Sequence, residues 1–337
     1  MSLPAAGTQE ISARTPRQKF QGHTDTVWGV IHLPGGQRIM TCSADGSLRV
    51  WDLKSGLQIG ENWEDGKSPV ATIALSPNGK AVASGSDDGV VRLWDIDTGN
   101  VIAKWMAHSG RVWSVCWSRD GQRVVTGSAD GTARVWDMKS RKKTILEPIN
   151  TGPISKNAVV YSPDETLIAM GGSSDIEIWD AKTGERVDAL KGHTNYVWCL
   201  AWTLDGKTLI SGSVDHSIRT WDTTTWKQIA VLRGHTNFVE SLAISPNGRI
   251  LASASFDKTA RLWNLENGWP ICSPLQHETT VTSTSFSADG MLLATGCNYS
   301  ISAYTWDVSA IVREAGLDYL LSDSDVSKNI FSVTPSY

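Results

Sequence analysis

The sequence predicts an all-β protein built from seven similar sheets, and three features of the 337-residue chain support this prediction. A tryptophan followed by Asp or Asn recurs at intervals of 42 or 43 residues, at Trp51, Trp94, Trp136, Trp179, Trp221, Trp263 and Trp306. A histidine lies 28 or 29 residues before five of these tryptophans, and an Asp lies six residues before five of them. Between these markers, short runs of β-branched and aromatic residues end at Asp-Gly or Asn-Gly turns, as the strands of hairpins do.

Each repeat contains the elements of one small sheet. In the third repeat, residues 112–117, 123–126 and 133–136 form three such runs separated by turns. A fourth, more polar run, such as residues 228–232, leads into the next repeat. With this period and its recurring His, Asp and Trp-Asp, the chain resembles the WD-repeat (WD40) family over about residues 15–307. The resemblance implies a seven-bladed β-propeller with one four-stranded blade per repeat.

The two ends of the chain complete this expected ring. Residues 15–21 precede the first histidine in the same way that residues 226–233 precede a later one. The family resemblance therefore implies that residues 15–21 form the outer strand of the seventh blade and close a propeller domain at residues 15–307. We expect residues 1–14 to be disordered. We expect residues 308–337, which begin with a helix-like run, to form a short C-terminal extension that is partly helical or docked on the propeller.

The composition excludes several classes of protein. The net charge is −4, the pI is about 6.0 and the Lys and Arg residues are scattered, so a basic surface for nucleic acid is not expected. No stretch of 18 apolar residues indicates a membrane span, and the first residues do not resemble a secretion signal. The five cysteines form no C-x-x-C pair, so we expect no metal site, no cofactor and no disulfide framework. These features favour the cytoplasm, with the nucleus as an alternative.

One set of residues has the composition of a hydrolase triad. His193, Ser211 and Asp215 are the residue types of a nucleophilic site, but equivalent sets recur in other repeats, whereas catalysis needs one asymmetric site. The family resemblance implies that each set forms a structural tetrad with the repeat tryptophan. The expected tetrads are His23, Thr41, Asp45 and Trp51; His108, Thr126, Asp130 and Trp136; His193, Ser211, Asp215 and Trp221; and His235, Ser253, Asp257 and Trp263.

Three repeats depart from this pattern. The second and fourth repeats have Gly66 and Gly152 where the histidine is expected, and the seventh has Asn298 eight residues before its tryptophan. We expect these three blades to be less firmly pinned than the others.

One position varies where the fold would be expected to keep it uniform. The residue after the first valine of each repeat is Trp28, Ala71, Trp113, Asn157, Trp198, Glu240 or Thr282. The resemblance implies that this position lies at the mouth of the central channel, near the residue that precedes the turn Asp. The expected partner-binding residues are Trp28, Trp113, Trp198, Asp87, Glu240 and Phe256. Aromatic rings and carboxylates together favour a cationic side chain. In the alternative interpretation, the tryptophans only fill the mouth.

The functional prediction is a monomeric, non-catalytic scaffold for protein–protein interaction that binds partner peptides, including basic ones, at the channel mouth or on the rim loops. One alternative is the substrate receptor of a ubiquitin ligase. That subgroup usually has an Arg shortly after Trp-Asp, where this chain has Lys54, Lys139 and Lys182. A propeller enzyme is the other alternative, and it would need a single polar cluster that the sequence does not indicate.

Overall fold

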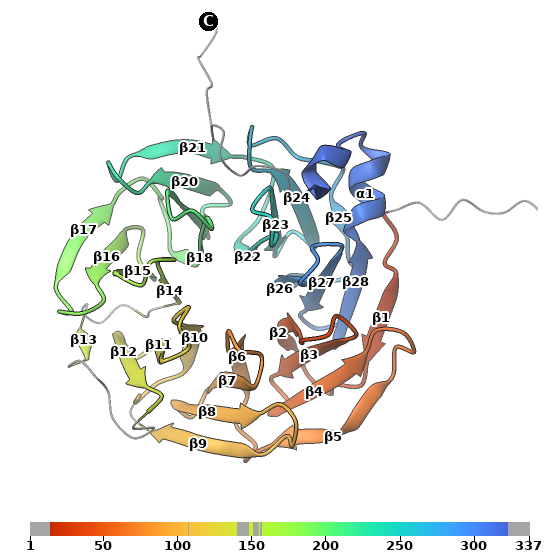
Figure 1. Cartoon of the computed structure of the whole chain (residues 1–337), viewed down its shortest axis with the longest axis horizontal. Helices are drawn as coiled ribbons and strands as arrows, with labels where there is room; N and C mark the ends of the chain where they lie inside the picture. Colours follow the sequence, from red (N-terminus) through yellow and green to blue (C-terminus); the bar gives the residue numbers. More distant parts are fainter. Residues whose placement is uncertain (1–13, 107, 140–147, 151–154, 156, 323–337) are drawn as a thin grey trace, which may run out of the picture.

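The computed structural model describes residues 14–106, 108–139, 148–150, 155 and 157–322. Within these residues, the alternating strand segments form seven four-stranded antiparallel sheets, arranged as blades around a central channel (Figure 1). The prediction of an all-β, seven-bladed propeller is confirmed. No helix in the described part of the chain is long and apolar enough to cross a membrane.

The four strands of each blade occupy the same four positions, from the channel to the outer surface. The inner strands are β2 (Val27–His32), β6 (Val70–Leu75), β10 (Val112–Trp117), β14 (Ala158–Tyr161), β18 (Val197–Trp202), β22 (Val239–Ile244) and β26 (Val281–Phe286). The second strands are β3 (Arg38–Ser43), β7 (Ala81–Ser86), β11 (Arg123–Ser128), β15 (Leu167–Gly171), β19 (Thr208–Ser213), β23 (Ile250–Ser255) and β27 (Leu292–Cys297).

The remaining strands form the outer half of each blade. The third strands are β4 (Ser47–Asp52), β8 (Val90–Asp95), β12 (Thr132–Asp137), β16 (Ile176–Asp180), β20 (Ile218–Asp222), β24 (Thr259–Asn264) and β28 (Ser302–Asp307). The outer strands are β5 (Gln58–Glu64), β9 (Val101–Met106), β13 (Ile149–Asn150), β17 (Arg186–Leu190), β21 (Gln228–Leu232), β25 (Leu275–Gln276) and β1 (Gln18–Gln21). Blades are numbered 1 to 7 by their inner strands, from β2 to β26.

The N-terminal strand closes the ring, as the sequence predicts. β1 is antiparallel to β28, with Gln18 opposite Thr305 and Gln21 opposite Ser302, so blade 7 contains both ends of the propeller. Figure 1 shows β1 lying beside β28 at the outer edge of that blade. Phe20 is the buried residue of β1 and packs into the apolar cluster between blades 7 and 1. Closure covers the outer edge of β28, and β1 takes the outermost position that the fourth strand holds in every other blade.

The hydrophobic core lies between neighbouring blades and not at the centre of the ring. One buried cluster, for example, joins Met40 and Leu48 of blade 1 to Val82 and Trp94 of blade 2. Each blade exposes two apolar faces, which its neighbours cover, so stability depends on the packing of successive repeats.

A short extension follows the last strand. Asp307 caps α1 (Val308–Glu314), and a 3₁₀ turn, η1 (Asp318–Leu321), comes after it. Ile311, Val312 and Leu320 are buried against blades 6 and 7. The side-chain amide of Asn247 donates to the Leu320 carbonyl at 2.8 Å. The segments for which the sequence predicts disorder or a tail, residues 1–13 and 323–337, lie outside the described residues.

Candidate functional site

The residue that varies at the channel mouth owes its position to a β-bulge. In six blades the pairing of the inner strand shifts between the leading valine and the second residue after it, for example between Val27 and Gly29. The residue between them therefore has no partner on the second strand. A β-bulge of this kind changes the direction in which the side chain of the extra residue points. The bulged residues are Trp28, Ala71, Trp113, Trp198, Glu240 and Thr282.

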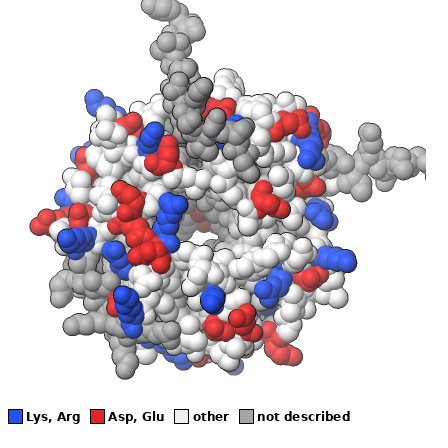
Figure 2. Space-filling view, in the orientation of Figure 1, with Lys and Arg blue, Asp and Glu red and all other residues white. Residues whose placement is uncertain are grey.

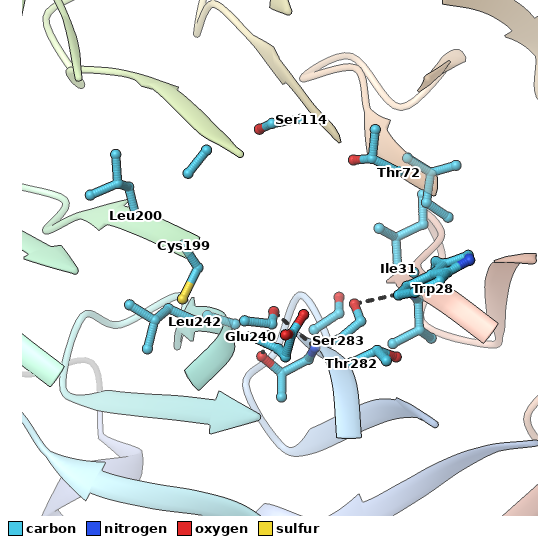
Figure 3. A pocket seen from close by; sticks show the side chains of 18 of the residues that line it. Trp28, Ile31, Thr72, Ser114, Cys199, Leu200, Glu240, Leu242, Thr282 and Ser283 are labelled. Carbon is cyan, nitrogen blue, oxygen red and sulfur yellow. Dashed lines mark hydrogen bonds between the residues drawn. The ribbon is translucent and has the colours of Figure 1, made fainter. Parts of the chain in front are cut away.

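These side chains line a channel of about 510 Å³, together with Asn157 of blade 4. Figure 3 shows Glu240, Thr282 and Ser283 close together on one side of the opening, with Thr72 and Ser114 across it. Figure 2 shows basic and acidic side chains intermingled around the central opening. The channel therefore offers a polar, partly aromatic mouth within a surface of mixed charge.

Two of the three predicted tryptophans are in direct contact. The rings of Trp113 and Trp198 meet edge to face, with their centroids 5.6 Å apart. Trp28 comes near Trp113 through a residue that the sequence analysis did not identify: the guanidinium of Arg111 lies 4.4 Å from the ring of Trp113 and 6.0 Å from that of Trp28. The same guanidinium forms an ion pair with Asp87.

Arg111 changes the interpretation of half of the site. The sequence predicts that Asp87 and the tryptophans receive a cation from a partner, but the chain itself places the Arg111 guanidinium there. The sequence does offer a signal for Arg111, since it stands at a second position that varies among the repeats. This position, two before the mouth residue, is Thr26, Pro69, Arg111, Ser155, Tyr196, Phe238 or Thr280. Its long side chain reaches the ring of its own blade and the carboxylate of the blade before.

Glu240 is the acidic residue of the mouth for which the chain supplies no cation within bonding distance in the described structure. Its surroundings in the channel raise the pKa of its carboxyl to about 8, because burial disfavours the charged form; a side-chain hydrogen bond with Trp198 acts in the opposite direction. A cation placed beside this carboxyl would lower its pKa again. Binding of a cation at this carboxyl would therefore be accompanied by release of a proton.

The structure does not bring Phe256 to the channel. Its ring packs 5.6 Å from that of Phe238, which in turn lies 6.1 Å from the ring of the exposed His216. Tyr196, 51% exposed, comes from the same variable column as Phe238. His216, Phe238 and Phe256 belong to blades 5 and 6 and form a separate aromatic cluster that does not line the channel.

Below the mouth, small residues connect neighbouring blades. The hydroxyl of Ser283 accepts a hydrogen bond from the backbone N–H of Val30 at 3.1 Å, and that of Ser241 accepts one from Thr284 N–H at 3.2 Å. A larger side chain would separate these strands. This accounts for the small residues one position after the mouth residue in the seven repeats, which are Gly29, Thr72, Ser114, Ala158, Cys199, Ser241 and Ser283.

Each complete tetrad forms one continuous chain of hydrogen bonds. In blade 5 the Trp221 indole N–H donates to Ser211 at 2.8 Å, and Ser211 contacts His193 Nε2 at 2.7 Å. His193 Nδ1 lies 2.8 Å from Asp215. Because a carboxylate only accepts, Nδ1 carries the proton and Nε2 accepts from the serine hydroxyl. The same three contacts join the four predicted residues in each of blades 1, 3 and 6.

The carboxylate is the anchor of each tetrad. Burial alone would raise the pKa of Asp130, but hydrogen bonds from Thr132, the Ser109 backbone and His108 outweigh burial and hold it at about 2. Asp215 is shifted well below its ordinary value for similar reasons, with His193 and Ser217 as its side-chain donors. Since the Thr194 N–H also donates to Asp215 at 3.1 Å, the carboxylate ties the loop to the sheet.

Blade 2 holds its turn aspartate with a different partner. It has Gly66 in place of the histidine, yet Asp88 is not left without a partner: Arg92 donates to it at 2.8 Å and to Asp65 at 2.7 Å. Lys104 also donates to Asp65 at 2.7 Å. Arg92 is only 7% exposed, so a buried guanidinium pins the loop in place of the imidazole. The weaker pinning predicted for blade 2 therefore stays a prediction, with Arg92 as the group that replaces the imidazole.

Blades 7 and 4 lack tetrad contacts for which no ion pair substitutes among the described residues. In blade 7, His277 contacts Thr295 at 2.9 Å, but its Nδ1 donates to the Leu275 carbonyl and not to an Asp. In blade 4, Met170 occupies the place of the hydroxyl, and the buried Trp179 indole nitrogen has no acceptor among the described residues. Gly152 lies outside the described residues.

Comparison with known proteins identifies the repeats. A sequence model of the WD40 family, described as "WD domain, G-beta repeat", matches residues 14–52, 62–95, 99–137, 184–222, 226–264 and 268–304. The stretch between the third and fourth matches contains most of blade 4, which has lost its tetrad.

Several curated proteins are similar over part of the chain. Mouse Striatin-4 is 25% identical over 197 residues, which are 58% of this chain and 21% of that protein. The human Intraflagellar transport protein 122 homolog is 36% identical over 59 residues, 18% of this chain and 5% of that protein. The zebrafish THO complex subunit 6 homolog is 40% identical over 60 residues, 18% of this chain and 19% of that protein. The matched region thus spans about a fifth or less of each relative's length.

Proposed function

The chain belongs to the WD40 repeat family, and from this premise we propose that it is a non-catalytic scaffold whose channel mouth binds a basic side chain of a partner protein. The coarser part of this proposal, a propeller related to scaffold and interaction proteins, agrees with the relatives that it matches. The finer part depends on Glu240.

A single observation supports the finer part. Arg111 already neutralises Asp87 and covers the face of Trp113, whereas the Trp198 indole is the one side-chain hydrogen-bond partner of Glu240 among the described residues. A Lys or Arg side chain entering the mouth would find one carboxyl and one aromatic wall on that side. Both groups attract cations, and the attraction is stronger where water is partly excluded.

The rest of the partner segment would contact the rim. The contacting rings of Phe238 and Phe256 lie in blade 6, as Glu240 does, and the exposed Tyr196 lies in blade 5, as Trp198 does. Rigid rings add apolar contact area at low cost in conformational entropy, which is typical of residues that dominate interfaces. We therefore propose that the partner segment carries an apolar residue near its basic residue.

The cellular location is also a proposal. The five cysteines are free thiols, and three of them, Cys42, Cys199 and Cys297, are buried. Free thiols suit a reducing compartment. This supports the cytoplasm; fluorescence microscopy of the tagged chain would test it, and retention in the secretory pathway would contradict it.

Binding should depend on pH. Between pH 6 and pH 8 the free Glu240 carboxyl is largely protonated, and a bound cation requires its charged form. Affinity for an Arg-containing hexapeptide should therefore rise with pH over this window and level off above the free pKa of about 8. Fluorescence anisotropy of the labelled peptide measures this rise.

Three variants separate the parts of the mouth. Glu240→Gln should weaken the Arg peptide about tenfold at pH 8 and remove the pH dependence, an effect of about 1.4 kcal/mol. Trp198→Ala should weaken binding more than Trp113→Ala, because Arg111 already occupies the face of Trp113. Glu61→Gln, which changes an exposed carboxylate in β5, is the matched control. If Glu240→Gln and Glu61→Gln bind the peptide as the parent does, the proposed site is wrong.

A further inference from the structure

Arg111 is the one charged residue at its position in the seven repeats. At the same position the other repeats have Thr26, Pro69, Ser155, Tyr196, Phe238 and Thr280. Arg111 directly precedes β10, so its side chain lies beside the channel mouth, where it forms the ion pair with Asp87. Six blades form without an arginine at this position. The fold therefore does not require Arg111, and its charge is an individual feature of blade 3.

A row of contacts connects Arg111 to the Glu240 side of the mouth. Its guanidinium lies over the ring of Trp113, at 4.4 Å, and over that of Trp28, at 6.0 Å. The Trp113 ring meets the ring of Trp198, and the Trp198 side chain is hydrogen-bonded to Glu240. A single indole, that of Trp113, therefore separates the guanidinium from the pair formed by Trp198 and Glu240.

The guanidinium keeps hydrogen-bond donors for a partner. Its ion pair with Asp87 uses Nη2, and neither Nη1 nor Nε has an acceptor among the described residues. The Arg111 side chain is 29% exposed, so an incoming group can reach it. Contact with the Trp113 ring holds the guanidinium in place. The mouth thus presents a fixed, accessible positive charge beside the place where Glu240 would receive a cation.

This positive charge acts in opposite ways on basic and acidic residues of a partner. In an extended peptide, side chains two residues apart lie on the same face about 7 Å apart, close to the 5.6 Å between the Trp113 and Trp198 rings. If one basic side chain is bound at Glu240, a second one two residues away would meet Arg111 and be repelled. A carboxylate at that place would instead accept hydrogen bonds from the guanidinium.

We propose that Arg111 determines the specificity of the channel mouth, which binds a partner segment with a basic and an acidic residue two positions apart and disfavours polybasic segments. The inference rests on the proposed function, because Glu240 receives the basic residue. Arg111 donates to the partner carboxylate through Nη1 and Nε, while Nη2 stays bonded to Asp87. Without Arg111, Asp87 and the face of Trp113 would be free to attract a second cation. Removal of one side chain should thus reverse the preference.

The test compares three fluorescein-labelled heptapeptides with a central Arg. Two positions to either side of it, the peptides have Glu, Gln or Arg, so the direction in which a peptide lies does not matter. Fluorescence anisotropy with the full-length chain at pH 8 should show the tightest binding for the Glu-flanked peptide and the weakest, by about tenfold, for the Arg-flanked peptide. The net charge of −4 alone would favour the Arg-flanked peptide, so this order is not an effect of bulk charge.

Three variants show whether Arg111 sets this order. Arg111→Met keeps a long side chain without the charge and should reverse the order, so that the Arg-flanked peptide binds best. Arg111→Lys keeps the charge and should still bind the Arg-flanked peptide most weakly, which a purely structural role of Arg111 does not predict. Arg119→Met, which removes an exposed arginine beyond the other end of β10, is the matched control and should keep the parent's order.

The experiment separates failure of this inference from failure of the proposed function. If no peptide binds, or if Glu240→Gln binds the Gln-flanked peptide as the parent does, the proposed function is wrong and the inference falls with it. If binding needs Glu240 but the parent binds the three peptides equally or prefers the Arg-flanked one, only the role of Arg111 is wrong. The parent's order in a folded Arg111→Met, checked by its melting temperature, would also overturn that role.

Discussion

Blades 4 and 5 are neighbours with the same architecture but different internal bonding. Both are four-stranded antiparallel sheets, and their second and third strands pair in equivalent register, with Ile168 opposite Trp179 and Leu209 opposite Trp221. Blade 5 has a complete tetrad, whereas the Trp179 indole nitrogen of blade 4 has no acceptor among the described residues. The tetrad is therefore not needed to form a blade. Alternating side chains and the packing of adjacent blades are sufficient for that.

Blades 4 and 5 also differ in the β-bulge of the inner strand. The inner strand of blade 5 has a bulge that directs Trp198 to the channel, but in blade 4 the strand begins at Ala158, one residue after the bulge position. Blades 2 and 7 lack a complete tetrad and keep the bulge. The blade that has lost the whole tetrad is thus the one in which the described inner strand lacks the bulge.

Acid should produce the largest change in the free energy of unfolding, because it protonates the tetrad carboxylates that blade 5 has and blade 4 lacks. The tetrad carboxylates have pKa values below the unfolded value of about 3.9, so the unfolded chain binds more protons below pH 4 and stability falls with decreasing pH. Between pH 4 and pH 2 the four tetrads should lose on the order of 5 kcal/mol together. Urea titrations at pH 5, 4 and 3 measure this loss. Asp215→Asn should lose less on acidification than the parent, and an identical slope would contradict the assignment.

The next largest effect should come from Asp215→Ala. It leaves His193 and two loop N–H groups without their acceptor and should lower the free energy of unfolding by about 2 to 3 kcal/mol. Asp175→Ala, the corresponding change in blade 4, should lie within about 0.5 kcal/mol of the parent, as surface substitutions do. Chemical denaturation compares the two variants, and equal losses would mean that the tetrad does not explain the difference between the blades.

Arg92→Met tests whether an ion pair replaces the histidine in blade 2. The change leaves Asp65 and Asp88 without the shared guanidinium and should cost about 2 kcal/mol. Salt screens a buried ion pair less than a surface pair such as Lys19 with Glu278. The stability lost in Arg92→Met should therefore change little in 1 M salt, whereas the stability contributed by the surface pair should fall. A loss below about 0.5 kcal/mol would restore the view that blade 2 is loosely held.

The smallest effect concerns the tryptophans themselves. Trp221→Phe removes both ring volume and the donor to Ser211, whereas Trp179→Phe removes ring volume and a donor without an acceptor. The blade 5 variant should therefore be less stable than the blade 4 variant by about 1 kcal/mol. Thermal unfolding of both proteins in one buffer gives the difference. A larger loss in Trp179→Phe would show that the indole of blade 4 has a role that the geometry does not reveal.

Most of the fold could be predicted because the seven repeats of the chain can be aligned with one another. Seven tryptophans at 42 or 43 residues fix the number of blades, and the similarity of residues 15–21 to residues 226–233 locates the closing strand. Strand positions depend on local alternation and turns, which are written in short stretches of sequence. The period could therefore predict the ring and its closure.

The site was harder to predict because it depends on long side chains that reach between blades. Arg92 and Arg111 each contact a carboxylate outside their own strand, and a column of aligned residues does not show such reach. The bulge was also missed, since it adds one residue without interrupting the hydrophobic pattern. The family resemblance implies a place for Phe256 near the mouth, but in the structure its ring packs against that of Phe238 in the same blade.

During synthesis, β1 is made long before β28, the strand with which it pairs. Gln21 pairs beside Ser302, 281 residues later, so β1 leaves the ribosome long before its partner exists. At about 5 to 20 residues per second, this interval is roughly 15 to 60 seconds. Throughout it, β28 is missing and the first blade is exposed on one side. The composition of β1 suits this delay: three of its four residues are Gln or Lys, and only Phe20 is buried at the end. A strand that must wait is thus kept soluble by its own polar residues until the ring can close.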